Sequence, residues 1–233
     1  MHCLQKQTAQ NPTLRSAQRQ DLSSLTIEEG MDEFCKWQKL VVMHIASLAI
    51  AASAMIIPGH CIAVPPGFQL LGSHGFTVGD VSSGVRTIYG ISDERGLQKL
   101  LIIQNEAINP GNATRYVYPL KPSRQIAGLP FKATIFASST TLSLSQEPGA
   151  ETAQTIRFLG VHHLKAGDLW IERRYAWHDD AGQIERLIFY MKTVDENQLS
   201  LQNLGPTDFP GWLRAFHEVA AEADVAIQAG PCA

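Results

Sequence analysis

The apolar segment at residues 40–63, LVVMHIASLAIAASAMIIPGHCIA, constrains this chain more than any other feature, because it decides in which compartment the remainder folds. Lys36 and Lys39 precede it, its first part carries no charged side chain, and small residues close it. A basic region, an apolar region and an exit of the A-x-A type are together typical of a secretory signal peptide. The sequence therefore predicts export, with cleavage after Ala54 or after Ala63.

Two alternatives to a cleaved signal remain open. The apolar character continues through Ile57 and so reaches roughly the 18 residues that a short membrane-spanning helix needs. His44 and the many alanines argue against a permanent span, and Pro58 with Gly59 would end the helix. An uncleaved anchor would still leave the following domain outside the cytoplasm. A buried core helix is the third interpretation.

The apolar segment divides the chain into three predicted parts. Residues 1–30 are polar, with repeated Gln, Ser and Thr, and bury too little apolar surface to offset the entropy of ordering. We interpret them as a disordered tail, or as a gene start placed too far upstream of a true start at Met31. Residues 31–63 are the signal peptide or anchor. Residues 64–233 form one exported globular domain, because about 170 residues suffice for one core but not comfortably for two.

The charge pattern restricts the partners of this domain. The chain has 19 Lys and Arg against 22 Asp and Glu, and the charges are scattered along it. Nucleic-acid binding needs a basic face, so we expect no nucleic-acid partner. The glycines lack the G-x-G-x-x-G spacing and the chain has no phosphate loop, so we expect no nucleotide cofactor. Membrane contact is expected only through an uncleaved N-terminal segment.

The four cysteines are Cys3, Cys35, Cys61 and Cys232, and the first two precede the export signal. Only cleavage after Ala54 would carry both Cys61 and Cys232 into an oxidising compartment, where disulfides persist. A bridge between them would then join the two ends of the mature domain. With cleavage after Ala63, Cys232 would instead be a lone thiol.

The domain reads as an antiparallel, meander-like sheet. Its first segment, residues 64–84, is rich in glycine, which predicts a loop. Short runs rich in Ile, Val, Thr and aromatic residues then alternate with turn residues, which is typical of strands in hairpins. These runs cover residues 85–91, 97–105, 114–120, 132–138, 141–146, 155–163, 169–178 and 184–193. No helical periodicity separates them, so a doubly wound parallel sheet is not expected.

The last two runs form the clearest predicted hairpin. A three-residue loop, Asp180 to Gly182, would place Tyr175 opposite Leu187 and leave one face nearly all apolar. A loop one residue shorter or longer would mix the polar and apolar sets. Burial of one face therefore favours the three-residue loop.

A long C-terminal helix completes the predicted α+β fold. Asp208 is its expected cap and Gly230 with Pro231 its expected stop. The apolar residues at helical spacing are Trp212, Phe216, Val219, Ala220 and Ala223. We expect this stripe to pack on one face of the sheet, and the acidic residues Glu218, Glu222 and Asp224 to form a polar face.

The candidate binding surface is the polar face of the predicted hairpin. Its residues are Arg174, Arg186 and Lys192, next to Tyr190 and Trp170. Arginine offers a planar fork of donors and aromatic rings offer a stacking surface, so this face suits a carboxylate, a phosphate or a carbohydrate ring. The alternative is a solvated sheet face on which Glu172 pairs with neighbouring arginines.

A metal or catalytic site is the weaker hypothesis. The candidates are His162, His163, His178, Asp179 and Asp180, whose imidazole and carboxylate groups suit zinc or acid–base chemistry. On a strand, His162 and His163 would face opposite sides, and an Asp pair suits a turn. The hydroxyl run at residues 138–141 lacks a nucleophile elbow. The sequence therefore assigns no catalytic residue, metal or cofactor.

The function that these patterns favour is an exported, non-enzymatic accessory or binding domain of the cell envelope or periplasm. Its polar sheet face would bind a partner protein, an envelope component, or a small anionic or carbohydrate ligand. The alternative is a small metal-dependent enzyme or hydrolase that uses His163, His178 and Asp180.

Overall fold

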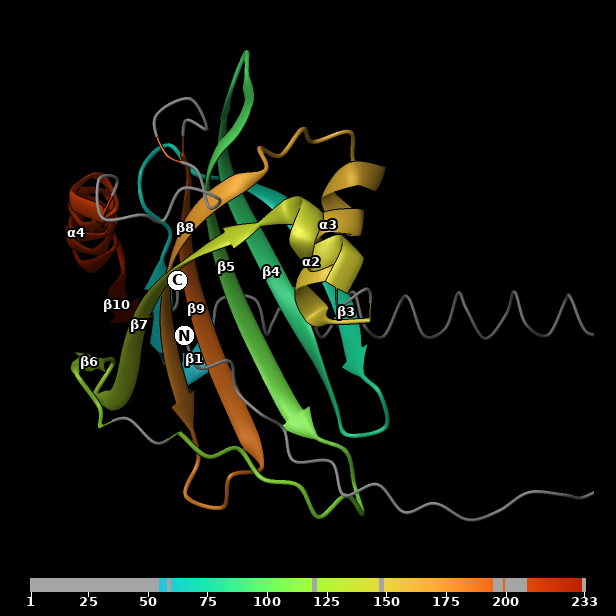
Figure 1. Cartoon of the computed structure of the whole chain (residues 1–233). Coiled ribbons are helices and arrows are strands. Elements are labelled where there is room, and N and C mark those ends of the chain that lie inside the picture. Colours follow the sequence, from blue (N-terminus) through green and yellow to red (C-terminus); the bar gives the residue numbers. More distant parts are fainter. Residues whose placement is uncertain are drawn as a thin grey trace, which may run out of the picture. The chain divides into compact units, whose positions relative to one another are not determined.

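Strands dominate the computed structural model of the chain (Figure 1). It describes residues 55–57, 60–118, 121–146, 149–194, 199 and 209–231. All of these belong to the compact unit Met43–Ala233. The expected tail, the export segment through Ala54 and the expected cap Asp208 lie outside the described residues. Within the described residues, no helix is both long and apolar enough to cross a membrane.

The main sheet has seven strands, all paired antiparallel with their neighbours. Their bounds are β3 (Gln69–Val78), β4 (Ser82–Asp93), β5 (Gly96–Ile108), β6 (Arg124–Ile126), β7 (Leu129–Ser139), β8 (Leu169–His178) and β9 (Ile184–Thr193). The spatial order is β3-β4-β5-β9-β8-β7-β6. It departs from a simple meander because β5 pairs with β9, which comes later in the chain.

A second, small sheet joins the two ends of the described domain. It consists of β1 (Met55–Ile57), β2 (His60–Ala63) and β10 (Gln228–Pro231), in the order β1-β2-β10. Antiparallel pairing places Gly230 opposite Cys61. Cys61 is disulfide-bonded, and its predicted partner Cys232 lies outside the described residues.

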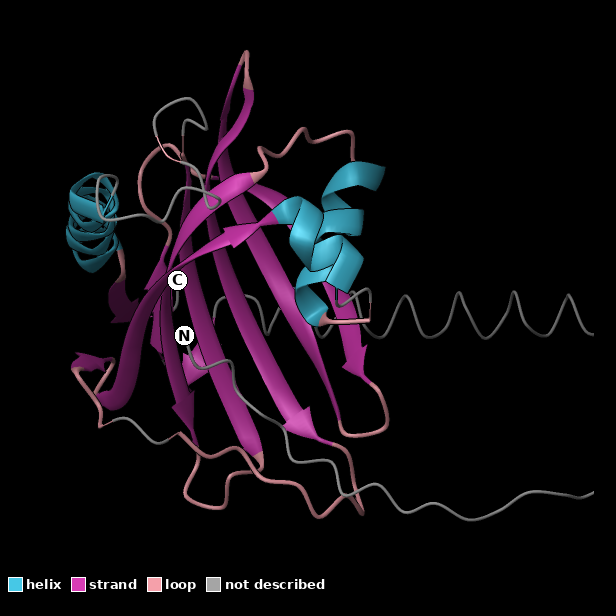
Figure 2. Ribbon diagram, in the orientation of Figure 1, coloured by secondary structure: helices cyan, strands magenta, loops and turns pink. Residues whose placement is uncertain are grey.

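Helices cover both faces of the main sheet (Figure 2). They are α2 (Thr140–Gln146), α3 (Glu151–Val161) and α4 (Phe209–Ala226). Strand residues alternate between the faces, so Ile188 and Tyr190 join one core under α4, whereas Phe189 and Met191 join a second core under α3. The sheet is thus buried on both sides, and the fold is of the α+β type with an antiparallel sheet and a C-terminal helix.

The predicted strands at 85–91, 97–105, 132–138, 169–178 and 184–193 are confirmed as β4, β5, β7, β8 and β9. The segment at residues 64–84, expected to be a loop, instead contains β3. Its glycines serve close packing: Gly72 has φ of 141°, and a Cβ there would lie 2.8 Å from the Phe158 ring of α3. Glycine therefore lets this edge strand pass beneath a helix.

The strands predicted at 141–146 and 155–163 are wrong, because these segments are α2 and most of α3. Their Thr, Ile and Phe content favours strands, but such propensity is weak and tertiary packing overrides it. The loop before β8 fixes the start of α2: Thr141 N donates to the Asp168 carboxylate at 2.7 Å, and the Thr140 hydroxyl donates to Gly167 O at 2.9 Å. The strand predicted at 114–120 is also wrong, since residues 114–118 have no regular structure.

The hairpin of β8 and β9 forms as predicted, but its register is shifted by one residue. Tyr175 lies opposite Ile188 and not Leu187, because the loop has four residues between the bonded pair Asp179 N and Ile184 O, 3.0 Å apart. The Asp179 carboxylate accepts from Gln183 N at 2.7 Å. The expected register relied on one solvated face, and here both faces are buried.

The apolar stripe of α4 packs on the sheet as predicted. Trp212, Val219 and Ala223 are buried in the core on this face, and Phe216 packs against it. The expected stop is wrong: the helix ends at Ala226, and residues 230 and 231 lie in β10.

Candidate functional site

The five residues of the predicted binding surface do not lie on one face. Trp170 and Arg174 point to the side of α2 and α3, and Trp170 is buried in that core. Tyr190 and Lys192 point to the side of α4, where both contact Glu222. Arg186 lies over the ring of Trp177 on the same side as α4. The one-residue shift in register and the two-sided burial separate residues that the sequence pattern had grouped.

The residues proposed for a metal site occupy three different structural positions. His163 follows the C-terminal end of α3 with φ of 57°, His178 ends β8 beside Tyr118, and Asp180 is exposed in the hairpin loop. His162 and His163 lie at a helix end and not on the predicted strand. In the part of the chain that the structure describes, no group of three or more His, Cys, Asp or Glu is placed to hold a metal ion.

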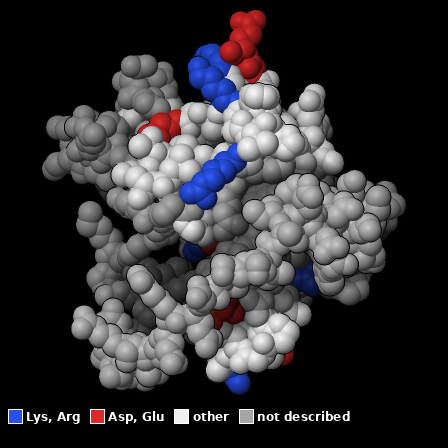
Figure 3. Space-filling view, turned by 90° about the vertical axis from the view of Figure 1, so that its right-hand side faces the viewer, with Lys and Arg blue, Asp and Glu red and all other residues white. Residues whose placement is uncertain are grey.

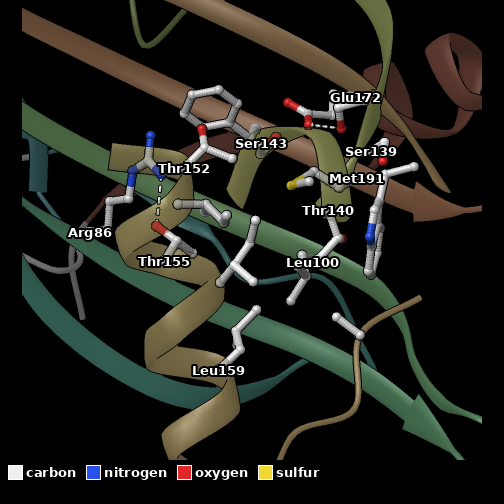
Figure 4. Close-up of a pocket in the computed structure, with 16 residues that line it drawn as sticks. Arg86, Leu100, Ser139, Thr140, Ser143, Thr152, Thr155, Leu159, Glu172 and Met191 are labelled. Atoms are coloured by element: carbon white, nitrogen blue, oxygen red, sulfur yellow. Dashed lines mark hydrogen bonds between the residues drawn. The ribbon is translucent and has the colours of Figure 1, made fainter. Parts of the chain in front are cut away.

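A small pocket lies between the sheet and the two helices α2 and α3 (Figure 4). Its volume is about 40 Å³. The apolar part of its lining includes Leu100, Ile102, Leu159, Trp170, Phe189 and Met191. Hydroxyl-bearing residues from α2, α3 and the end of β7 also line the pocket, namely Ser138, Ser139, Thr140, Ser143, Thr152 and Thr155. The Ser139, Thr140 and Thr155 hydroxyls already donate to Asp168, Gly167 O and Glu151 O. The pocket therefore combines an apolar floor with polar residues along its edge.

Arg86 of β4 supplies the positive charge in this pocket and is only 2% exposed. Its Nε donates to Gln104 Oε1 at 2.6 Å, and its Nη1 donates to Thr155 Oγ1 at 2.7 Å. The guanidinium carbon lies 5.4 Å from the Phe76 ring centre and 5.3 Å from that of Phe189. Burial lowers the pKa of Arg86 to about 10, although nearby glutamates oppose this shift. The side chain remains a cation at neutral pH.

Glu172 of β8 supplies the negative charge and is only 5% exposed. Burial raises the pKa of its carboxyl group, while the hydrogen bond from the Ser138 hydroxyl and the charges of Arg86 and Arg174 act in the opposite direction. Figure 4 shows Arg86 and Glu172 on opposite sides of the pocket, with Ser143 and Thr152 between them. Neither charged group forms an ion pair with a described residue.

A neutral relay links Arg86 to a second buried carboxylate. Gln104 accepts from Arg86 and donates to Glu106 Oε2 at 2.7 Å, and Ser82 donates to the other oxygen of Glu106. The amide thus stands between a cation and an anion that do not touch. This relay orients the guanidinium without neutralising it by direct contact.

Several polar contacts attach the helices over the pocket to the sheet and to the loop before β8. His74 of β3 stacks on Phe158 with ring centres 5.0 Å apart, and its Nε2 lies 3.1 Å from Thr155 Oγ1. Gln154 Nε2 donates to Thr77 O at 2.9 Å. Burial lowers the pKa of His74, so the ring is neutral near pH 7. The α2–α3 pair is therefore positioned as a cover over the pocket.

Charged side chains of the described residues are scattered over the outer surface on this side (Figure 3). At the tip of the β4–β5 hairpin, Arg95 pairs with Asp93 at 3.0 Å. Charge at the pocket, in contrast, is inside the molecule and not on its surface.

Sequence reasoning did not single out Arg86, Gln104 or Glu106, and it used Glu172 only as a pairing partner. A signal was present, because polar residues interrupt the otherwise apolar strands at 85–91 and 97–105. A polar residue that faces a core needs a buried partner. Which partner it meets depends on strand order, which the sequence alone does not specify.

The geometry defines a mixed α+β domain with a covered, charged pocket. Comparison with family models found no match for this chain, and neither curated proteins nor solved structures matched it.

Proposed function

We propose that this chain is an exported, non-enzymatic binding domain that holds a small zwitterion between the sheet and α2–α3. The observation that carries the proposal is the pair of buried, opposite charges in one pocket, Arg86 and Glu172, neither of them in an ion pair with a described residue. An apolar pocket with a few convergent polar groups of perturbed pKa is the usual form of a ligand site.

The energetics favour a ligand that carries both charges. A buried charge without a contacting counter-charge costs several kcal/mol by order of magnitude. A carboxylate would pair with the guanidinium fork of Arg86, and an ammonium group would pair with the carboxylate of Glu172. The apolar floor would receive a short side chain. Amino acids and related small zwitterions have this pattern.

The size and lining of the pocket limit the ligand further. A space of about 40 Å³ is far below the roughly 300–1,000 Å³ that is usual for a ligand site, so even glycine or alanine would enter only with an outward movement of α2 and α3. The hydroxyls of Ser143 and Thr152 can each donate or accept, so they adapt to the remaining polar atoms of a ligand. A larger zwitterion would require a larger movement of the two helices.

The export part of the proposal rests on two features. One is the signal-like segment at residues 40–54. The other is the disulfide at Cys61, because disulfides persist in oxidising compartments. Gly230 lies opposite Cys61, two residues before Cys232, so the pairing of these two cysteines remains our expectation.

Isothermal titration of the purified full chain tests the ligand. We expect glycine and alanine to bind, and acetate, ethylamine and propanamide, which lack one or both charges, to bind at least about 10-fold more weakly. R86Q and E172Q should each weaken the binding of glycine and alanine about 10-fold or more. R95Q is the matched control, because Arg95 is exposed on the β4–β5 hairpin. Equal binding of zwitterions and singly charged analogues, or no binding of either, would refute the proposal.

Cell fractionation with a non-reducing peptide map tests export. We expect the chain outside the cytoplasm, with the peptide that contains Cys61 joined to the one that contains Cys232. A cytoplasmic protein whose Cys61 is a reduced thiol would contradict export while leaving the ligand test intact.

A further inference from the structure

A second, open groove lies on the opposite face of the main sheet, beside α4. Its volume is about 680 Å³, which is within the range of small-molecule sites. The segment that follows β2 forms one wall and the C-terminal half of α4 forms the other. The wall residues that matter below are Val64, Pro65, Pro66, Phe68 and Val225.

A cluster with an excess of positive charge borders this groove: Lys99, Tyr190 and Glu222 line the groove, and Lys192 adjoins them through Glu222. The ammonium groups of Lys99 and Lys192 both contact the carboxylate of Glu222, and the Tyr190 hydroxyl donates to it at 2.8 Å. Burial alone would raise the pKa of Glu222, but the hydrogen bonds from Lys99, Tyr190 and Lys192 lower it to about 2. Glu222 is therefore ionised at neutral pH, and two cations share one anion.

These cations are within reach of a ligand. The Lys99 and Lys192 side chains are 28% and 39% exposed, so both ammonium groups retain contact with solvent. A ligand anion in the groove can thus approach Lys99 without unfolding the cluster. A ligand cation would meet two positive charges and only one negative charge.

The walls of the groove are apolar and open to solvent. Val225 is 76% exposed and Val64 is 38% exposed. Phe68 lies next to Tyr190, with ring centres 6.1 Å apart. Exposed apolar walls beside a charged cluster are complementary to a molecule with an apolar body and a charged end.

We propose that this groove binds a single-chain amphiphile with a carboxylate head. The head lies at Lys99, where its single negative charge balances the net positive charge that Lys99, Lys192 and Glu222 carry together. The chain runs along Val64, Phe68 and Val225. This site is separate from the zwitterion pocket, because the two lie on opposite faces of the sheet.

Titration of the full chain with decanoate, below its critical micelle concentration, tests this site. Decanol and decyltrimethylammonium are the matched probes, because they keep the chain but change the head. We expect decanoate to bind at least about 10-fold more tightly than either, since only its head carries a charge opposite to that of the cluster, and a 10-fold difference corresponds to about 1.4 kcal/mol. Equal affinity for decanoate and decanol would overturn the proposal.

Two variants locate the binding. K99M should weaken the binding of decanoate about 10-fold and leave the binding of decanol unchanged, and R214M, on an exposed position of α4, should change neither affinity. V225E adds a negative charge to the wall at a highly exposed position and should abolish decanoate binding with the fold intact by circular dichroism. Unchanged decanoate binding in both K99M and V225E would refute the site. Because R86Q should retain decanoate binding, failure here is distinct from failure of the zwitterion proposal.

Discussion

The two faces of the main sheet differ in whether their charged side chains contact a group of opposite charge. On the α4 face, each of two carboxylates on the helix has cationic partners from the sheet: Glu222 contacts Lys99 and Lys192, and Asp224 contacts Arg124. On the α2–α3 face, Arg86 and Glu172 are more deeply buried, and neither forms an ion pair with a described residue. The same sheet thus carries one set of contacting charges and one set of separated charges.

Asp224 illustrates how the contacting set positions a helix. Arg124 Nη1 lies 2.5 Å from its carboxylate and Arg173 Nη2 lies 3.7 Å from it, while the Tyr175 hydroxyl donates to the same oxygen. Both guanidinium carbons lie 5.4 Å from the centre of the Tyr175 ring. Tyr175 is fully buried in the core under α4, so this cluster fixes the C-terminal half of α4 over the sheet.

The difference suggests different roles for the two faces. Partly exposed, contacting charges orient an element at modest net cost. Buried charges that contact no opposite charge lower stability unless a ligand pairs with them, which makes them candidates for a functional site. We therefore interpret the α4 face as the more rigid half of the domain and the α2–α3 face as the half adapted to a ligand.

The largest effect on the free energy of unfolding should come from Trp212, the buried residue that anchors α4 on the sheet. Trp212→Ala removes a fully buried side chain and should lower the free energy of unfolding by about 3–5 kcal/mol. Leu213→Ala, at the neighbouring exposed position, should change it by less than about 0.5 kcal/mol. Urea unfolding measures both. Similar small losses for the two variants would mean that α4 does not anchor this face.

An intermediate effect on the free energy of unfolding should distinguish the carboxylate that contacts a cation, Asp224, from the one that does not, Glu172. Asp224→Asn weakens contacts to Tyr175 and Arg124 and should lower the free energy of unfolding by about 1–2 kcal/mol. Glu172→Gln removes a buried carboxylate whose charged form burial disfavours and that contacts no cation among the described residues, so it should change stability by less than about 0.5 kcal/mol or raise it. Asp180→Asn, in the exposed loop, is the control for charge removal. An equal loss for D224N and E172Q would remove the distinction between the faces.

The smallest effect is the contribution of Glu222 to the pH dependence of the free energy of unfolding. Its pKa in the folded chain is about 2, below the ordinary value of 4.5, so the folded state binds this proton less readily than the unfolded state. The contribution is therefore present above about pH 4.5 and is lost as the pH falls from there towards 2. After screening by solvent, it should amount to about 1 kcal/mol.

Urea unfolding of the natural chain and of E222Q at pH 6 and pH 3 measures this contribution. The difference between the two proteins should be largest at pH 6 and should narrow at pH 3. A difference that stays constant or widens towards pH 3 would show that the lysine contacts do not hold Glu222 in its ionised form.

Part of the candidate site was predictable and part was not. Trp170, on the predicted list, does line the α2–α3 pocket, and Tyr190 and Lys192 do lie together beside the second groove. The grouping of all five residues on one face failed, because it assumed that one sheet face was solvated: Trp170 and Arg174 lie on the α2–α3 side, whereas Arg186, Tyr190 and Lys192 lie on the α4 side. Arg86 was missed for the same reason: a charge in an apolar strand is informative only once its buried neighbours are known.

The sequence by itself determined five strands of the main sheet and the apolar stripe of α4. Alternation along a strand and the spacing of a helical stripe are local properties, and they persist in any fold that buries them. The tertiary structure decided that residues 140–146 and 151–161 are helices, that the β8–β9 loop has four residues, and which charges touch. Each of these depends on what covers the second face of the sheet, and that cover comes from segments far apart in the chain.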